Sequence, residues 1–218
     1  MFTGIVTAIG HIVDAQALGA NDTHGSRLTI ETPAGYIDDV QQGDSIALNG
    51  ACMTVTTLDA SARRFMVDIS AESLARTSGL DARNAVNLEK GLRLADRLGG
   101  HLVSGHVDGV GAVTRFAPVG ESFELRVRAP RELARFIAPK GSITVNGVSL
   151  TVNELSDTRD GIEFSINLIP HTLRSTTLGT LELGHAVNLE IDLIARYVER
   201  MLGGAHDRES GGVHPLIV

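Results

Sequence analysis

The chain has 218 residues, of which 43% are hydrophobic and 21% charged, and its formal net charge is −7 at pH 7. That length allows one large domain or two of about one hundred residues each, with enough apolar residues for a core. The negative charge excludes a general attraction to nucleic acid or anionic lipid, and no apolar stretch is long enough to span a membrane. The single cysteine excludes an intrachain disulfide and a thiolate metal cage, so we expect a reducing, cytoplasmic setting.

The chain begins with a rather apolar segment. Residues 1–13 are followed by Ala15-Gln16-Ala17, which resembles the small residues of a leader cleavage site. No Lys or Arg precedes the apolar stretch, however, and Gly4 and Gly10 interrupt it. We therefore expect this segment to belong to the fold.

The first half of the chain has the pattern of a small β-protein. Its short runs of Val, Ile and Thr, separated by Gly, Asp and Pro, predict strands at residues 4–13, 26–32, 44–49, 51–57, 64–69 and 85–90. The dipeptide Asn49-Gly50 favours a type I′ hairpin turn, in which both central residues need a positive φ. After Pro33, and again after Pro130 in the second half, the apolar spacing predicts one helical segment each, with proline at the first position. About six short strands at close spacing indicate a closed or nearly closed barrel.

The second half repeats the first in the same order. The segment Ser45–Val55 returns as Ser142–Val152, so that Asn146-Gly147 takes the place of the first hairpin turn. Four further blocks return at similar offsets: residues 3–6 as 104–107, 28–33 as 125–130, 73–77 as 172–176, and 85–89 as 186–190. The sequence therefore predicts a tandem duplication, with one barrel at residues 1–97 and a second at 98–191.

The last element has no counterpart between the repeats. From Asp192 onward, apolar residues follow a helical spacing that places them on one stripe: Leu193, Ile194, Tyr197, Val198, Met201 and Leu202. Asp192 can cap the start of this helix, and Gly203 can end it. We expect a helix at residues 192–204 and a flexible tail at 205–218. The stripe leaves two alternatives open, packing on the adjacent barrel or oligomerisation.

The strand after each hairpin turn carries polar side chains on one face. Strand alternation directs Cys52 and Thr54 to one side, and Met53 and Val55 to the other. Ser149 and Thr151 occupy the corresponding positions in the second repeat. A solvent-facing strand would explain this pattern, but the polar pair recurs in both copies, which favours a shallow ligand site lined by hydroxyl and thiol groups. Because Ser149 replaces Cys52, the requirement is for a small polar group and not for redox chemistry.

Two histidines and one lysine could take part in proton transfer or charge stabilisation. His101 and His106 flank the junction between the repeats, and as a metal pair they lack a third ligand nearby in the sequence. Their ordinary pKa suits proton transfer near neutral pH. A hydrolase triad of His106, Ser149 and Asp192 is disfavoured because the Gly-x-Ser-x-Gly motif is absent. Lys140 is either a surface residue or a cation near developing negative charge.

Several motifs together resemble one family. They are Met1-Phe2-Thr3-Gly4-Ile5-Val6, Asn49-Gly50-Ala51-Cys52-Met53-Thr54-Val55, residues 99–107, residues 146–152, Leu168-Ile169-Pro170 and Thr176-Thr177-Leu178-Gly179. In this order, and with the internal duplication, they resemble the α-chain type of riboflavin synthase over about residues 1–200. Each motif alone is weak, but the set is specific.

The resemblance implies an all-β fold of two tandem six-stranded Greek-key barrels, each binding one 6,7-dimethyl-8-ribityllumazine. It implies a dismutation in which one lumazine gives a four-carbon unit to the other, forming riboflavin and 5-amino-6-ribitylamino-pyrimidinedione. No metal or external cofactor is expected. The family also implies a homotrimer assembled through the C-terminal helix, with each active site between two subunits, and it suggests an association with lumazine synthase.

The resemblance also assigns residues to the site. Catalytic roles fall on Phe2, Ser45, Cys52, His106, Lys140, Ser149 and Asp192. Substrate contacts are expected from Gly4, Ile5, Val6, Met53, Thr54, Asp68, Ile69, Ser70, Ala71, Glu72 and Ser73. In the second half they are expected from His101, Gly105, Val107, Leu150, Thr151, Asn167, Leu168, Ile169, Pro170, His171 and Thr172.

One position departs from the family pattern, and one alternative function stays open. Some members carry Asp where this chain has Asn146, so we do not assign a base to that position. Lumazine- and flavin-binding antenna proteins share the duplicated barrels without the full polar set in both halves. The presence of Phe2, Cys52, His106, Lys140 and Ser149 favours the enzyme. The sequence has six Phe, two Tyr and no Trp, so a flat ligand must be held mainly by polar groups and by a second ligand molecule.

Overall fold

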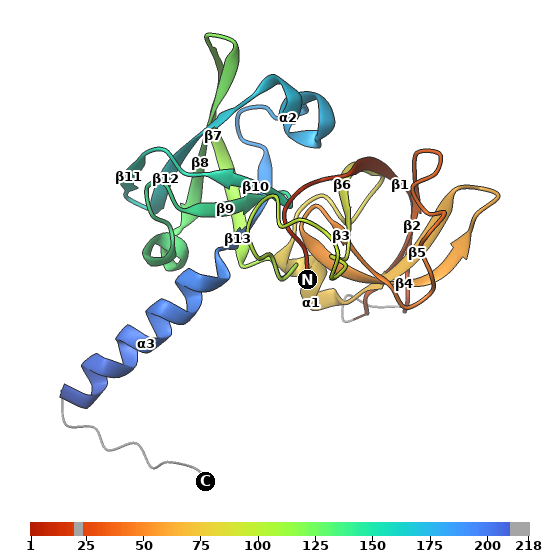
Figure 1. The fold of residues 1–218 in the computed structure, drawn as a ribbon, viewed down its shortest axis with the longest axis horizontal. Coiled ribbons are helices and arrows are strands. Elements are labelled where there is room, and N and C mark those ends of the chain that lie inside the picture. The colour runs from red at the N-terminus through yellow and green to blue at the C-terminus, as the bar shows by residue number, and fades with distance from the viewer. Residues whose placement is uncertain (20–23, 210–218) are drawn as a thin grey trace.

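The computed structural model describes residues 1–19 and 24–209. It forms two β-sheet halves that lie side by side, with a C-terminal helix projecting away from both (Figure 1). The prediction of two all-β halves and one C-terminal helix is confirmed.

The first half is a closed barrel, as predicted. Its strands are β1 (Ala8–Ala17), β2 (Ser26–Glu31), β3 (Ser45–Leu48), β4 (Ala51–Asp59), β5 (Arg64–Ile69) and β6 (Asn84–Lys90). They close in the order β1-β2-β5-β4-β3-β6, and every described pair is antiparallel. A short helix, α1 (Ala71–Arg76), connects β5 to β6.

The second half repeats this order with one strand divided in two. Its elements are β7 (Gly109–Val119), β8 (Ser122–Pro130), η1 (Arg131–Phe136), β9 (Ser142–Val145), β10 (Val148–Thr151), β11 (Leu155–Thr158), β12 (Gly161–Leu168), α2 (Pro170–Ser175), η2 (Thr177–Thr180) and β13 (Ala186–Ile191). The sheet order is β10-β9-β13-β7-β8-β12-β11. The counterpart of β4 is thus present as β10 and β11, at opposite ends of the sheet. Between them Asn153 N donates to Ser165 O at 2.8 Å, which keeps this segment joined to β12.

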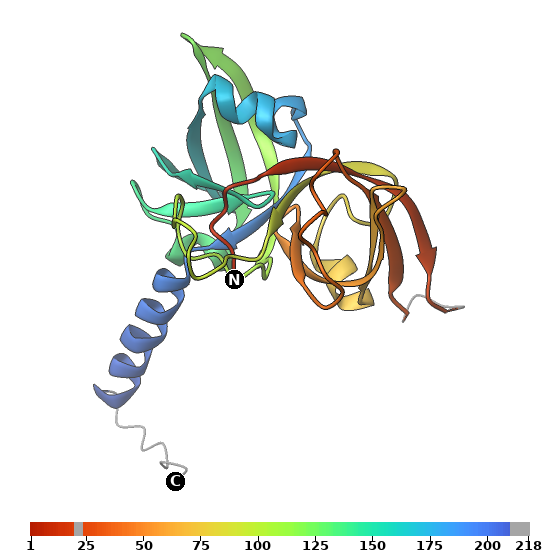
Figure 2. The same cartoon turned by 45° about the vertical axis from the view of Figure 1, so that its right-hand side comes forward.

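Each half has its own apolar core. Phe65 and Phe164 are fully buried at the centres of the first and second cores. Val6, however, packs against the core of the second half, and Val107 packs against the core of the first. The segment that begins each repeat therefore crosses to the other half. Figure 2 shows the N-terminal segment (red) along the boundary between the two halves.

The two hairpin turns meet at that boundary. Asn49 and Asn146 have φ values of 45° and 48°, and the glycines that follow also have positive φ, as a type I′ turn requires. A Cβ atom on Gly147 would lie 2.7 Å from Gly50 N. Glycine is therefore needed here both for its backbone conformation and for the close approach of the two halves.

Buried asparagines join the halves reciprocally. Asn87 Nδ2 donates to Asn146 O at 2.9 Å, and Asn188 Nδ2 donates to Asn49 O at 3.1 Å. The side-chain oxygen of Asn146 accepts from Asn188 N at 2.8 Å. Asn146 thus has a structural role at the boundary, in agreement with our leaving it without a catalytic assignment.

Some boundaries differ from the sequence-based prediction. The first strand begins at Ala8 and not at residue 4, because the segment before it runs along the boundary, where Val6 packs against the core of the other half. The segment after Pro33 forms consecutive turns at residues 34–39 and no helix, whereas the helical segment predicted after Pro130 is present as a 3₁₀ helix that begins one residue after the proline.

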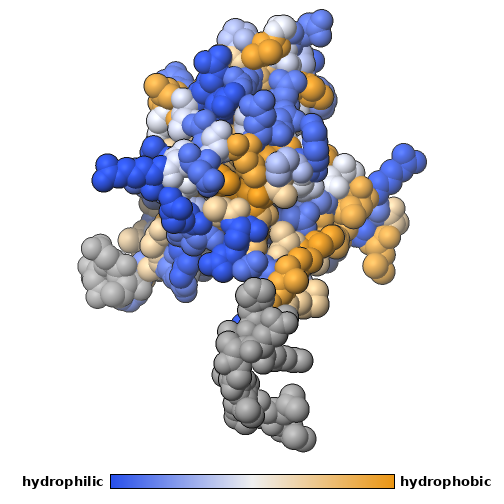
Figure 3. All heavy atoms as spheres, turned by 90° about the vertical axis from the view of Figure 1, so that its left-hand side faces the viewer, coloured by the Kyte–Doolittle hydropathy of each residue, from blue (hydrophilic) through white to orange (hydrophobic). Residues whose placement is uncertain are grey.

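The C-terminal helix, α3 (Leu193–Glu209), extends beyond Gly203, where we expected it to end. Its apolar stripe does not pack on the adjacent barrel: Tyr197 is 62% exposed and Met201 68%. Arg196 pairs with Asp108 at 2.6 Å near the base of the helix. Figure 3 views the side from which α3 projects and shows apolar atoms gathered on that face. Residues 210–218 of the predicted tail lie outside the described residues.

Among the described residues, no helix has the length and apolar character needed to cross a membrane.

Candidate active site

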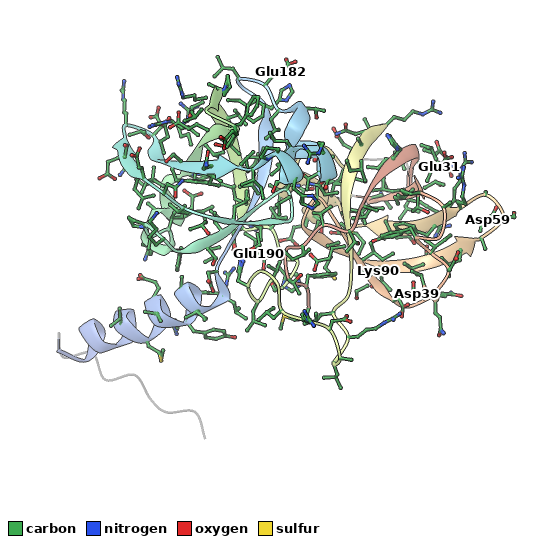
Figure 4. All side chains as sticks on the ribbon, turned by 45° about the horizontal axis from the view of Figure 1, so that its top comes forward. Glu31, Asp39, Asp59, Lys90, Glu182 and Glu190 are labelled. Atoms are coloured by element: carbon green, nitrogen blue, oxygen red, sulfur yellow. The ribbon has the colours of Figure 1, made fainter. Side chains whose placement is uncertain are left out.

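Two loops cover the boundary between the halves, and each is held by a buried carboxylate. The N-terminal loop (residues 1–5) donates to Glu89 from Thr3 N at 2.7 Å, Thr3 Oγ1 at 2.8 Å and Gly4 N at 3.0 Å. The linker loop (residues 101–105) donates in the same way to Glu190, which lies on β13 at the centre of Figure 4. Burial raises the pKa of both carboxyls, and the hydrogen bonds from the loops act against that rise.

Each loop also contacts the strand after the hairpin turn of the other half. Ser149 N donates to Gly4 O at 2.7 Å, and Cys52 N donates to Gly105 O at 2.8 Å. A Cβ atom on Gly4 would lie 2.6 Å from Ser149 Cβ, and one on Gly105 would lie 2.6 Å from Cys52 Cβ. The two predicted polar strands are therefore covered by loops in which the positions of Gly4 and Gly105 have no space for a larger residue.

In the first half, the polar residues lie on the outer face of the barrel, as predicted. Met53 and Val55 are buried in the core, whereas Cys52 is half-buried and Thr54 exposed. Ser45 pairs with Thr54 on the neighbouring strand, so both side chains share that face. Phe2 is fully buried against this region, in a small apolar cluster with Ala47, Val103 and Cys52.

In the second half, Ser149 has a histidine partner. His101 Nδ1 is 2.8 Å from Ser149 Oγ, and within the described chain His101 Nε2 has no hydrogen-bond partner. Burial lowers the pKa of His101, and the charge of Asp192 opposes this effect. A neutral imidazole at this distance can exchange a proton with the serine hydroxyl. Thr151 is exposed on the same face, and Leu150 packs against the core.

The partner of Ser149 excludes the triad that we considered. His106 is exposed, and among the described residues no hydrogen bond joins it to Ser149, whose hydroxyl faces His101 instead. Asp192 Oδ1 accepts from Ile194 N at 2.8 Å, so this carboxylate caps the start of α3 as predicted.

A cavity of about 890 Å³ adjoins the polar face of the first half. Ser45 and Ile5 are the predicted site residues that line it, beside charged residues of β6 and the segment after it. Lys90 Nζ lies 2.6 Å from Asp39 Oδ1, and Arg93 pairs with the other oxygen of the same carboxylate. Figure 4 shows Lys90 and Asp39 close together at this edge of the barrel. The opening therefore presents both charge signs beside the Ser45 hydroxyl.

Lys140 occupies a position that is glycine in the first half. Lys140 N donates to Val152 O at 2.7 Å, and Gly43 N donates to Val55 O at 2.9 Å in the corresponding place. Both residues have positive φ, 66° for the lysine and 94° for the glycine. A side chain in this conformation is strained, which is consistent with a functional reason for the lysine.

The segments that follow β5 and β12 lie at the strand-to-helix turns, as predicted. Asp68 forms a two-pronged ion pair with Arg27, and Asn167 Oδ1 accepts from Ser122 Oγ at 2.8 Å. Ile69 and Leu168 are buried in the cores, and Ser70 caps α1. The remaining predicted residues of these segments lie on the turns and first helical residues: Ala71, Glu72, Ser73, Ile169, Pro170, His171 and Thr172. No hydrogen bond among the described residues joins either segment to Cys52 or Ser149.

Sequence reasoning missed four residues that organise the site, namely Glu89, Glu190 and the two asparagines Asn87 and Asn188. A signal was present, because all four belong to the repeated block at residues 85–89 and 186–190. The strand pattern hid them, since Glu in a strand is ordinarily read as solvent-facing. The described residues contain no group of three potential metal ligands.

The comparisons with known proteins match both halves. The lumazine binding domain matches residues 3–91 and 104–192. A riboflavin synthase of Photobacterium phosphoreum is 41% identical over 93% of this chain and 89% of its own. Riboflavin synthases of Mycobacterium tuberculosis and Bacillus subtilis are 42% and 39% identical, over 94% and 96% of this chain and 100% and 94% of theirs.

The chain belongs to the riboflavin synthase family.

Solved structures with the same architecture hold flat heterocyclic ligands. LumP in complex with 6,7-dimethyl-8-(1′-D-ribityl) lumazine has a TM-score of 0.74 and 28% identity, covering 88% of this chain and 99% of that one. LumP in complex with riboflavin has a TM-score of 0.76 and 29% identity over the same shares. The duplicated halves of this riboflavin synthase family member thus have the architecture of a protein solved with lumazine and with riboflavin.

Proposed function

We propose that the protein catalyses the dismutation of two molecules of 6,7-dimethyl-8-ribityllumazine. One molecule transfers a four-carbon unit to the other, giving riboflavin and 5-amino-6-ribitylamino-pyrimidinedione. Because one molecule gains what the other loses, the reaction needs no external oxidant or reductant. The observation that carries the proposal is the riboflavin synthase identity of about 40% along nearly the whole chain.

The duplicated polar strands support one ligand per half. Cys52 and Thr54 in the first half correspond to Ser149 and Thr151 in the second, and each set lies on an exposed or half-buried face. Small hydroxyl and thiol groups can bind the polar edge of a heterocycle. A reaction between two bound molecules gains most from fixed proximity and orientation.

The chemistry requires a proton acceptor and stabilisation of negative charge. The donor lumazine must lose a proton from its 7-methyl group, which leaves a carbanion delocalised over the ring. The neutral His101 beside Ser149 Oγ can accept a proton in the second half. Lys140 supplies a positive charge on the same half, suited to the developing anion. Phe2, Ser45 and Cys52 would serve the other ligand.

We also propose that α3 assembles the chain into a homotrimer whose active sites form between subunits. The support is the apolar stripe of α3, whose residues from Ile194 to Leu202 are exposed in the single chain. Apolar surface of this kind is stabilised by contact with another copy. Truncation after Asp192 should leave folded monomeric barrels with low activity. Sedimentation measures the mass, and a truncated protein that remains trimeric would contradict this role of the helix.

The second candidate function is that of a non-catalytic lumazine- or flavin-binding protein. The LumP complexes favour it, since the whole of that fold aligns with this chain. Its identity of 28–29% is lower than that of the synthases.

The test is turnover by the purified full-length protein. Mixed with 6,7-dimethyl-8-ribityllumazine and no added metal, it should form riboflavin, which is followed by its absorbance and fluorescence. Substitution Ser149→Ala should lower the rate with the fold intact, as checked by circular dichroism. Tight binding of the lumazine without turnover would contradict the enzyme and support the binding protein.

A further inference from the structure

Among the described residues, neither buried carboxylate accepts a hydrogen bond from Cys52 or Ser149; both are bonded to the loops that cover those residues. Glu89 is 6% exposed and Glu190 2%, and each accepts three hydrogen bonds from one loop. Each carboxylate lies in the half to which its loop belongs in sequence. A buried carboxylate is costly unless it is fully hydrogen-bonded, so it strongly favours the loop conformation that supplies those donors.

The other side of each loop reaches into the opposite half. Gly4, held by Glu89 through its N–H, accepts from Ser149 N through its carbonyl at 2.7 Å. Gly105, held by Glu190 at 3.0 Å, accepts from Cys52 N at 2.8 Å. A single glycine thus joins a carboxylate in one half to a site strand in the other.

The contacts leave little freedom for the loops to adjust. A Cβ on Gly100 would lie 2.8 Å from Ser149 Cβ, so the chain around His101 is pressed against the serine. Phe2 N donates to Val103 O at 2.8 Å, which ties the two loops to each other. Displacement of either loop would therefore move the residues that cover the polar strand beneath it.

We propose that Glu89 and Glu190 are crossed positioning residues, such that Glu89 holds the Ser149 strand of the second half and Glu190 holds the Cys52 strand of the first. Each half therefore controls the geometry of the site in the other. The consequence for lumazine binding rests on the proposed function, whereas the positioning itself can be measured without any ligand.

Cys52 makes this measurable, because it is the only thiol of the chain. Its reaction with an aromatic disulfide reagent reports how often the linker loop uncovers it. Glu190→Gln should accelerate that reaction about tenfold, the effect expected for the loss of a charge-assisted hydrogen bond. Glu89→Gln, a matched substitution of a similarly buried carboxylate, should change the rate much less, by about twofold, because Glu89 affects this cover only through Phe2 and its hydrogen bond to Val103.

The reciprocal experiment moves the reporter to the other half. In the double variant Cys52→Ser with Ser149→Cys, the thiol lies under the N-terminal loop. Glu89→Gln should now accelerate its reaction about tenfold, and Glu190→Gln should not. Comparison of the two thiols separates positioning from a general loss of stability. A general loss of stability would accelerate the reaction of the thiol at position 52 and of the thiol at position 149 with either glutamine substitution.

The milder variant Ser104→Ala removes one of the three bonds to Glu190, at 2.7 Å, and keeps the carboxylate. It should also accelerate the reaction of Cys52, so it can replace Glu190→Gln if that variant does not fold. Equal acceleration of both thiols by either glutamine variant, or no change with any of them, would overturn the proposal. A positive thiol result without riboflavin formation would leave the positioning intact and reject only the proposed function.

Discussion

The two halves of the molecule share one frame but differ where the chemistry would occur. The residues that hold the turns and the loops are of the same type in both halves: Asn49 and Asn146 at the turns, and Glu89 and Glu190 under the loops. At the candidate site, the first half has Cys52 at the position where the second half has Ser149. His101 adds a side chain for which the first half has no counterpart. The repeated positions hold the turns and loops in the same way in both halves, and the two halves differ in the side chains of the candidate site. Under the proposed function, this difference would give the two ligands different roles.

The largest expected effect on stability comes from a substitution at the turns where the two halves meet. Gly147→Ala would place a Cβ 2.7 Å from Gly50 N, and it would also force alanine to a φ of 77°. We expect the free energy of unfolding to fall by more than about 2 kcal/mol, measured by urea denaturation.

Gly184→Ala is the matched control for that substitution. Gly184 has a φ of 86°, and a Cβ there would meet nothing within 4 Å. Its cost should therefore be the backbone strain alone, about 1 kcal/mol. Equal losses at the two glycines would mean that the contact between the halves contributes little.

A smaller effect on stability is expected at Lys140, where a substitution should change activity and stability in opposite directions. Lys140→Gly makes the second half match Gly43 and removes the strain of a side chain at a φ of 66°. The protein should become more stable by about 0.5–1 kcal/mol, while riboflavin formation slows about tenfold or more. Thermal unfolding and initial rates measure the two effects. A more stable variant with full activity would remove Lys140 from the site.

The smallest expected effect is a difference between the wild type and a Glu89 variant in how the free energy of unfolding depends on pH. Burial raises the pKa of Glu89, so the folded chain keeps that proton to a higher pH than the unfolded chain does. The free energy of unfolding must then fall as the pH rises from the ordinary carboxyl pKa through the raised one. Glu89→Gln lacks this dependence, so the stability advantage of the wild type over that variant should shrink with rising pH.

A surface carboxylate supplies a control of opposite sign. Hydrogen bonds from Arg126 and then Arg115 lower the pKa of Glu124. The advantage of the wild type over Glu124→Gln should be present above the ordinary carboxyl pKa and disappear as the pH falls. Urea denaturation across the acid range measures both pairs, and parallel curves would contradict the burial effect at Glu89.

Sequence reasoning reached the duplicated architecture because local signals agreed with it. The Asn-Gly turns, the alternation along β4 and the repeated blocks each point to the same fold, and the faces of Cys52 and Met53 were predicted correctly. The packing of Val6 on the core of the other half was not predicted, because an apolar segment carries no sign of which core it joins. For the same reason, the pairing of Ser149 with His101 instead of His106 depended on three-dimensional contacts that spacing does not encode.

The crossed loops also set an order of events during synthesis. Residues 8–90 can close the first barrel as soon as they leave the ribosome, since its strands all lie within that range. Glu190, however, which anchors the cover over Cys52, is made 138 residues after that cysteine, the difference between positions 190 and 52. The loop over Cys52 thus lacks its anchor until β13, the last strand in the described part of the chain, has been translated.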